Sequence, residues 1–256
     1  MAKFHGEMSG LSGLGPARAR RQILPAALSF MALATTLILS LTAAAATQAA
    51  DCGGSPAPGL DWRECSKKSL VLQGSNLSGA DLGGADFSMT NLSDSNLARA
   101  NFEKANLMRT WFNGASAEKA NFDHVEAYRS SFANAVANGA TFLSAELQRA
   151  DFSGARLTGA SFEKAELGRA NFDNATLTGA RFSLANLSRA DFSSAVFEGP
   201  LAFEHAFMFL TRIEGLDLSA ATGLEQSQID LACGDAKTKL PAGLKTPAGW
   251  PCPPPE

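Results

Sequence analysis

A five-residue repeat fills the middle of this sequence and limits what the chain can fold into. A small residue, then Asp or Asn, then Leu or Phe recur, as in Ala80, Asp81 and Leu82. The third position, called here the central residue, recurs every five residues from Leu72 to Phe197 and is Leu or Phe except at Ala117, Ala127 and Ala137. Neither the helical period of 3.6 nor the strand period of two keeps such residues on one face. The repeat therefore predicts a chain that turns a corner every five residues.

The pattern A-(D/N)-(L/F)-x-x resembles the pentapeptide repeat family over about 150 of the 256 residues. Near Gly199 and Pro200 the period slips by one residue, and it resumes at Phe203. The resemblance implies an all-β solenoid, a right-handed quadrilateral β-helix with four repeats in each coil. At a strand spacing of about 4.8 Å, some 7–8 coils would make a rod roughly 36 Å long.

The composition fits this coil, because the sequence has 17 Phe but only 1 Tyr. Central residues twenty apart in the sequence fall on the same wall, and two opposite walls carry most of the Phe. We therefore expect two stacked Phe ladders that fill the core, with aromatic contacts adding about 0.5–1.5 kcal/mol each beyond burial. The ladders consist of Phe112, Phe132, Phe152, Phe172 and Phe192 on one wall, and Phe102, Phe122, Phe142, Phe162 and Phe182 on the other.

The first 49 residues have the three parts of a secretory signal peptide. A leader that ends in Arg20 and Arg21 precedes the uncharged apolar stretch 23–41, and an Ala-rich segment with small residues suited to cleavage follows. The segment predicts export to the periplasm or the outside of the cell. The alternative is an uncleaved membrane anchor, since residues 23–46 are long enough to cross a bilayer. After cleavage we expect no contact with the membrane.

The remaining chain divides into an N-terminal cap (50–69), the repeat coil (70–220) and a C-terminal cap (221–256). A capping-box pattern from Thr222 to Glu225 predicts a short helix over 224–233, with Gly234 in the left-handed conformation after it. The Pro-rich tail follows, and its Trp250 is expected to cover the last coil.

Four cysteines lie beyond the leader, two near each end of the repeat. Export favours disulfide bonds, and four cysteines allow three pairings. A rod of the length implied by the resemblance keeps its ends too far apart for a bridge between them. We therefore predict the disulfides Cys52–Cys65 and Cys233–Cys252 rather than a zinc site.

The sequence predicts neither enzymatic activity nor a cofactor or metal site. It has no nucleophile elbow, zinc-protease motif, phosphate loop or dinucleotide fingerprint. Asp and Asn before the central residue belong to the repeat and are poor candidates for acid–base catalysis. The net charge of −3 gives no reason to expect nucleic-acid binding.

Five arginines recur every twenty residues and should stack along one corner of the rod. Acidic residues nearby suggest a compensated, solvated column, whereas the alternative is a groove for a polyanion or an acidic partner. Met108, Trp111 and Tyr128 project outward beside Arg109 and Arg129, which is the arrangement of an interaction patch with a charged rim. The remaining members of the column, candidates for facing an anion, are Arg149, Arg169 and Arg189.

The features together predict an exported structural or binding module that presents a rigid surface to a protein or another component of the cell envelope. A second hypothesis follows from the resemblance, because some pentapeptide repeat proteins mimic DNA and bind gyrase. The export signal and the arginine column argue against it, and the sequence leaves the partner unidentified.

Overall fold

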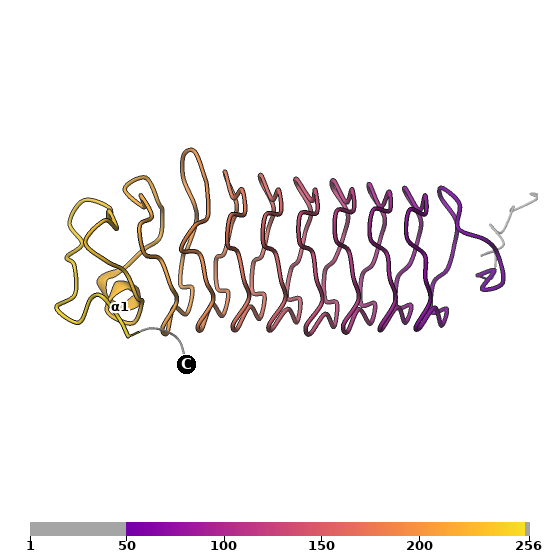
Figure 1. The fold of residues 1–256 in the computed structure, drawn as a ribbon, viewed down its shortest axis with the longest axis horizontal. Coiled ribbons are helices and arrows are strands. Elements are labelled where there is room, and N and C mark those ends of the chain that lie inside the picture. Colours follow the sequence, from indigo (N-terminus) through magenta and orange to yellow (C-terminus); the bar gives the residue numbers. More distant parts are fainter. Residues whose placement is uncertain (1–49, 254–256) are drawn as a thin grey trace, which may run out of the picture. The chain divides into compact units, whose positions relative to one another are not determined.

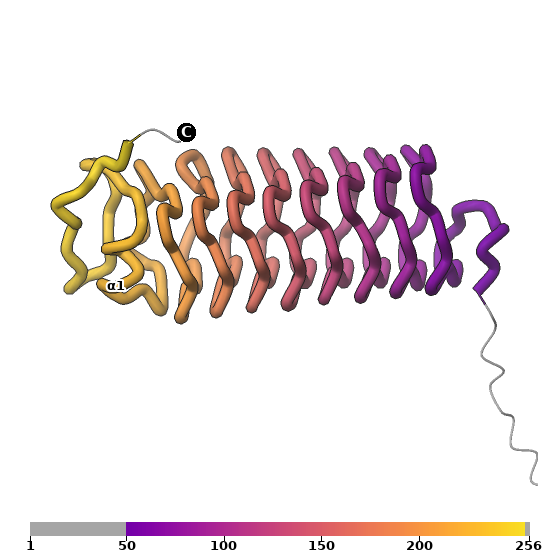
Figure 2. Tube along the Cα trace, turned by 90° about the horizontal axis from the view of Figure 1, so that it is seen from below, coloured from indigo at the N-terminus to yellow at the C-terminus, as the bar shows by residue number. Residues whose placement is uncertain are grey.

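The computed structural model describes residues 50–253, which wind into one continuous coil with a small appendage at each end (Figures 1 and 2). The predicted signal peptide, residues 1–49, lies outside the described residues. Parallel bridges join residues twenty apart, from Asp61 with Asp81 to Thr176 with Val196. The β-helix expected from the five-residue period is thus confirmed.

Each repeat is a tight turn followed by a single bridging residue. At Leu82, the carbonyl accepts a hydrogen bond from the amide of Ala85 (3.2 Å), and Gly84 between them has φ +65°. A positive φ at the third residue defines a type II turn, which favours Gly. The amide of Gly84 also donates to the carbonyl of Glu103 in the next coil (2.8 Å). Turns and coils are therefore held by the same set of backbone hydrogen bonds.

The core consists of the two predicted Phe ladders. Rings within a ladder lie nearly parallel, as between Phe132 and Phe152, whose centroids are 5.0 Å apart with a 10° interplanar angle. Rings of opposite ladders meet edge to face, as between Phe152 and Phe162 at 5.4 Å and 83°. Both arrangements are favourable for aromatic quadrupoles. All the ladder Phe residues are buried.

The coil begins before residue 70, inside the segment expected to be a separate cap. Asp61 already forms a β-bridge with Asp81, and Trp62 is buried with its ring centroid 6.3 Å from that of Phe87. Lys67 occupies a central, inward position. Its Nζ donates to the carbonyl of Cys52 (2.7 Å) and lies 3.5 Å from the centre of the Trp62 ring, and burial lowers its pKa. A Lys in place of Leu or Phe hides this first coil from a pattern search.

The predicted frame slip is present, because Arg181 pairs with Ala202 and Asp191 with Arg212, each twenty-one residues on. The expected helix over 224–233 is shorter. Only α1 (Gln226–Ile229) is helical, with its capping box at Glu225 and Gln228 rather than at Thr222. The helix ends at Ile229 because the chain rejoins the coil, where Cys233 forms a parallel β-bridge with Arg212.

Gly234 does not have the left-handed conformation predicted for it. A Cβ at this position would lie 2.3 Å from the ring of Trp250, so glycine is needed for close packing. The Trp250 ring covers this end of the coil, and its Nε1 donates to the carbonyl of Ala232 (2.7 Å). Both predicted disulfides, Cys52–Cys65 and Cys233–Cys252, are present, one at each end.

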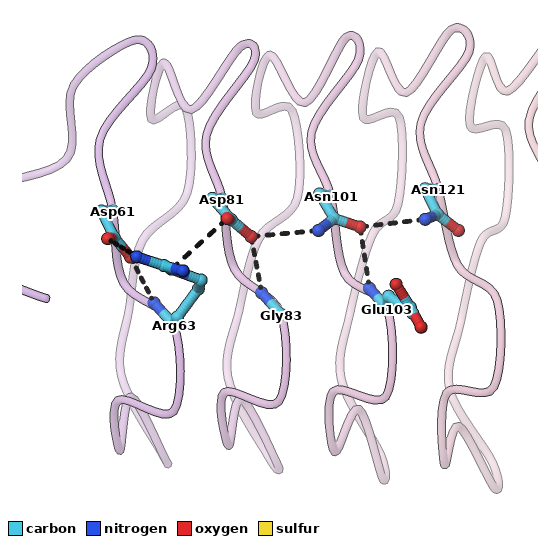
Figure 3. A network of polar contacts seen from close by, with 7 residues as sticks. All are labelled: Asp61, Arg63, Asp81, Gly83, Asn101, Glu103 and Asn121. Atoms are coloured by element: carbon cyan, nitrogen blue, oxygen red, sulfur yellow. Dashed lines mark hydrogen bonds and ion pairs between the residues drawn. The ribbon is translucent and has the colours of Figure 1, made fainter. Parts of the chain in front are cut away.

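A polar ladder runs along one face from the first coil (Figure 3). Asp81 accepts hydrogen bonds from the Asn101 side chain (3.0 Å) and from its own turn, and Asn101 accepts one from Asn121 (2.9 Å). Arg63 begins the ladder, because it pairs with Asp61 (2.6 Å) and reaches Asp81 (3.4 Å). The hydrogen bonds from Arg63 lower the pKa of Asp61 to about 2.

We predict that the Phe ladders carry much of the stability. Phe152→Ala should lower the free energy of unfolding by about 3–5 kcal/mol, as expected for a buried aromatic side chain. Phe207→Ala should cost far less, because Phe207 is 51% exposed. Urea denaturation of both variants measures the difference, and equal losses would contradict the register after Pro200.

The Asp61–Arg63 pair predicts a pH dependence of stability. The folded-state pKa of Asp61 lies below its ordinary value of 3.8, so the charged form stabilises the fold above about pH 4. Asp61→Asn should therefore be less stable than wild type at pH 6, and the difference should disappear as pH falls to about 2. In an Arg63→Gln background the Asp61→Asn difference should be small at both pH values. A difference that persists at pH 2 in urea melts would disprove the link.

Candidate functional site

The described residues offer no evident catalytic or metal centre. Within 50–253 no three His, Cys, Asp or Glu side chains gather as metal ligands, and no helix is long and apolar enough to span a membrane. His124 and His205 are exposed. The Asp and Asn residues before the central position serve the turn, as Asp86 does by accepting a hydrogen bond from the amide of Ser88 (2.9 Å). The candidate site is therefore a surface.

The five arginines of the sequence pattern form a column along one corner, called here the arginine ridge. The amide of each of the first four arginines donates to the carbonyl of the residue before the next Arg, as Arg129 does to Gln148 (3.1 Å), and the amide of Arg189 donates to the carbonyl of Phe209 (2.8 Å). One ladder of backbone hydrogen bonds thus holds the ridge at the coil spacing of about 4.8 Å. The side chains are all exposed, and their order along the rod is Arg109, Arg129, Arg149, Arg169, Arg189.

The compensating ion pairs expected for this column do not form. None of the five guanidinium groups lies within 4 Å of a carboxylate of residues 50–253. Two of the flanking acids bind their own turns: Asp151 accepts a hydrogen bond from the amide of Ser153 (3.0 Å), and Asp191 accepts one from the amide of Ser193 (2.9 Å). The ridge therefore presents positive charge to solvent.

The ridge arginines occupy a backbone conformation that favours glycine. Their φ angles lie between +54° and +60°, where a side chain costs of order 1–3 kcal/mol. The opposite corner uses Gly at the equivalent position of most coils, whereas the ridge corner has none. These opposite-corner glycines are Gly59, Gly79, Gly139, Gly159, Gly179 and Gly199.

The predicted interaction patch lies at the N-terminal end of the ridge. Trp111 is 45% exposed on the face beside Arg109, and Met108 is 40% exposed on the corner. Tyr128 is half-buried, with the Arg129 guanidinium 5.1 Å from its ring centre. The structure extends this patch to residues that the sequence analysis did not select. The N-terminal patch is defined here as Leu70, Val71, Met89, Met108, Trp111 and Tyr128.

A second exposed apolar cluster lies at the other end of the ridge and was missed from the sequence. Phe207, Phe209 and Leu231 are each at least 40% exposed and form the C-terminal patch. The available signal was the pair of Phe residues on either side of the inward Met208. Of the ten large exposed hydrophobic residues in the described chain, only Leu184 and Val196 lie away from this corner and its two adjoining faces.

Comparisons with known proteins agree with the repeat. A model described as pentapeptide repeats (8 copies) matches residues 75–114, and a pentapeptide repeat region model matches 105–182. No curated protein matches the sequence.

Solved structures with similarity include three pentapeptide repeat proteins. A trypsin-treated variant of QnrB1, a plasmid-mediated fluoroquinolone resistance protein, is 20% identical (TM-score 0.45), covering 72% of this chain and 91% of its own. HetL from Nostoc is 22% identical (TM-score 0.26), and the match covers 77% of this chain and 94% of HetL. A protein of the Arabidopsis thaliana thylakoid lumen is 23% identical (TM-score 0.18), and the match covers 65% of this chain and 79% of that protein.

The positive φ angles of the ridge predict that its arginine side chains do not raise the free energy of unfolding. Arg149→Gly should raise the free energy of unfolding by roughly 0.5–1.5 kcal/mol, because glycine adopts the positive φ without strain. Arg149→Ala keeps the strain and should leave stability nearly unchanged. Urea melts of both variants test this, and a loss of stability in Arg149→Gly would show that the guanidinium group supports the coil.

Proposed function

The chain belongs to the pentapeptide repeat family, and on this premise we propose that it is an exported, non-catalytic binding module. Its rigid coil presents the arginine ridge and the N-terminal patch to an acidic protein of the cell envelope. The observation that carries the proposal is the gathering of unpaired arginines and exposed hydrophobic side chains on one corner.

The chemistry of this corner favours a protein partner. Trp, Tyr, Met and Arg are the residue types enriched at protein interfaces, and an apolar centre with a charged rim is the usual arrangement of a binding hot spot. Five guanidinium groups with no carboxylate of residues 50–253 within 4 Å fit a stripe of carboxylates on the partner. Because these charges are exposed, such binding should weaken as salt rises.

Two features support export. The first 49 residues have the pattern of a signal peptide, and two disulfides hold the ends of the coil, which suits an oxidising compartment. The short helix α1 and the tail around Trp250 would then serve as a cap that protects the end of the coil from pairing with other chains. DNA mimicry has less support, because the ridge places a row of five positive charges along one edge of the coil.

The decisive variant is Trp111→Ala, with Gln148→Ala as its control further along the same corner. Trp111→Ala should leave the melting temperature almost unchanged, because the side chain is 45% exposed. It should weaken partner binding by about 2 kcal/mol or more, as expected for a hot-spot Trp, whereas Gln148→Ala should change neither property.

Proximity labelling and pulldown with the mature protein from intact cells, repeated with both variants, provide the measurement. Recovery of the same proteins in equal amount with wild type and Trp111→Ala would refute the proposal. A large loss of stability in Trp111→Ala would show that the side chain contributes to the core instead.

A further inference from the structure

The C-terminal patch has the features of a docking site. Phe207 and Phe209 project outward on either side of the inward Met208, and their rings stack with centroids 6.4 Å apart and an 11° interplanar angle. Phe207 forms a β-bridge with Asn186 of the preceding coil, so an apolar residue takes the place of a polar one on this face. Leu231 extends the patch onto the segment after α1.

A hollow of about 300 Å³ opens beside these rings, between the coil and α1. Its apolar lining includes Phe207, Met208 and Leu231, and its polar lining includes His205 and Glu225. Gln228 also lines the hollow, and its buried side chain connects α1 to the coil by donating hydrogen bonds to two coil carbonyls, one of them that of Ala206 (2.9 Å). A preformed hollow of this kind suits one apolar side chain of a protein partner.

The two patches are joined by the arginine ridge. The row of backbone hydrogen bonds that holds the ridge also includes the amide of Met89 donating to the carbonyl of Met108 (2.9 Å) on one side, and the amide of Leu210 donating to the carbonyl of Leu231 (2.8 Å) on the other. Five coil steps separate Met108 from Phe209, which is about 24 Å at the coil spacing. The corner thus has a fixed order: an apolar anchor, a row of cations and a second apolar anchor.

We infer that the C-terminal patch is a second anchor for the same partner, and that the partner contacts the ridge with an acidic α-helix carrying an apolar side chain near each end. This inference rests on the proposed function. A helix covers about 24 Å in about 16 residues, and its carboxylates on one face recur about every 5.4 Å. That spacing lies close to the 4.8 Å spacing of the arginines, whereas side chains on one face of a strand recur about every 6.7 Å.

The probe is a designed alanine-based helical peptide of about 22 residues. It carries two Phe eighteen residues apart, which is five full turns and about 27 Å, so both lie on one face, with Glu at each turn between them. A comparison peptide has Ala in place of one Phe. Binding to the mature protein is titrated for wild type, Trp111→Ala and Phe209→Ala. Val196→Ala is the matched control, because Val196 is exposed on a different face.

We expect the two-Phe peptide to bind wild type about tenfold more tightly than the one-Phe peptide, and Phe209→Ala to abolish that advantage. Val196→Ala should change nothing. If Trp111→Ala weakens binding while Phe209→Ala does not, the second anchor is refuted and the proposed function stands. If neither peptide binds, the inference is also overturned. The proposed function is then tested independently by the pulldown that compares wild type with Trp111→Ala.

Discussion

Backbone hydrogen bonds between successive coils are the interaction on which the rest of this molecule depends. Residue Leu82, for example, donates to Asn101 (2.7 Å), and Asp81 donates to Leu60 (2.9 Å). Such bonds form where equivalent residues of successive coils lie in register, and most coils achieve this by closing after twenty residues through four similar turns, whereas the slip near Pro200 makes a coil of twenty-one that still pairs. The inward residues then fall into register, and the Phe ladders stack as a consequence.

The same constraint limits where function can lie. Inward positions are filled by packing, and an Asp or Asn before a central position is used by its own turn, as Asp86 is. Binding must therefore use outward positions, which repeat every twenty residues along the rod. The arginine ridge shows the result: five equivalent positions carry the same charge, although their positive φ disfavours any side chain.

The two ends of the coil need additional interactions, because the backbone groups of the first and last coils have no neighbouring coil on one side. At the first coil, Lys67 takes an inward position and satisfies the carbonyl of Cys52, which the Cys52–Cys65 disulfide holds in place. At the last coil, Trp250 packs over Gly234, and the second disulfide fixes the tail. Each cap is thus specific to its end, whereas the coil between them is uniform.

The period of five determined the coil, the Phe ladders and the arginine column, because each is a consequence of spacing along the chain. The pairing of the cysteines also followed, once the coil separated its ends. Other features were decided only in three dimensions. Burial of a charged Lys67 depends on a carbonyl fifteen residues away, and the end of α1 is set by the return of Cys233 to the ladder. Only the structure shows that no carboxylate of residues 50–253 lies within 4 Å of a ridge guanidinium group, because spacing along the sequence places several acids nearby. The C-terminal patch likewise required the structure: the slip predicted from the sequence turns Phe207 and Phe209 outward, but only the fold brings Leu231 beside Phe207.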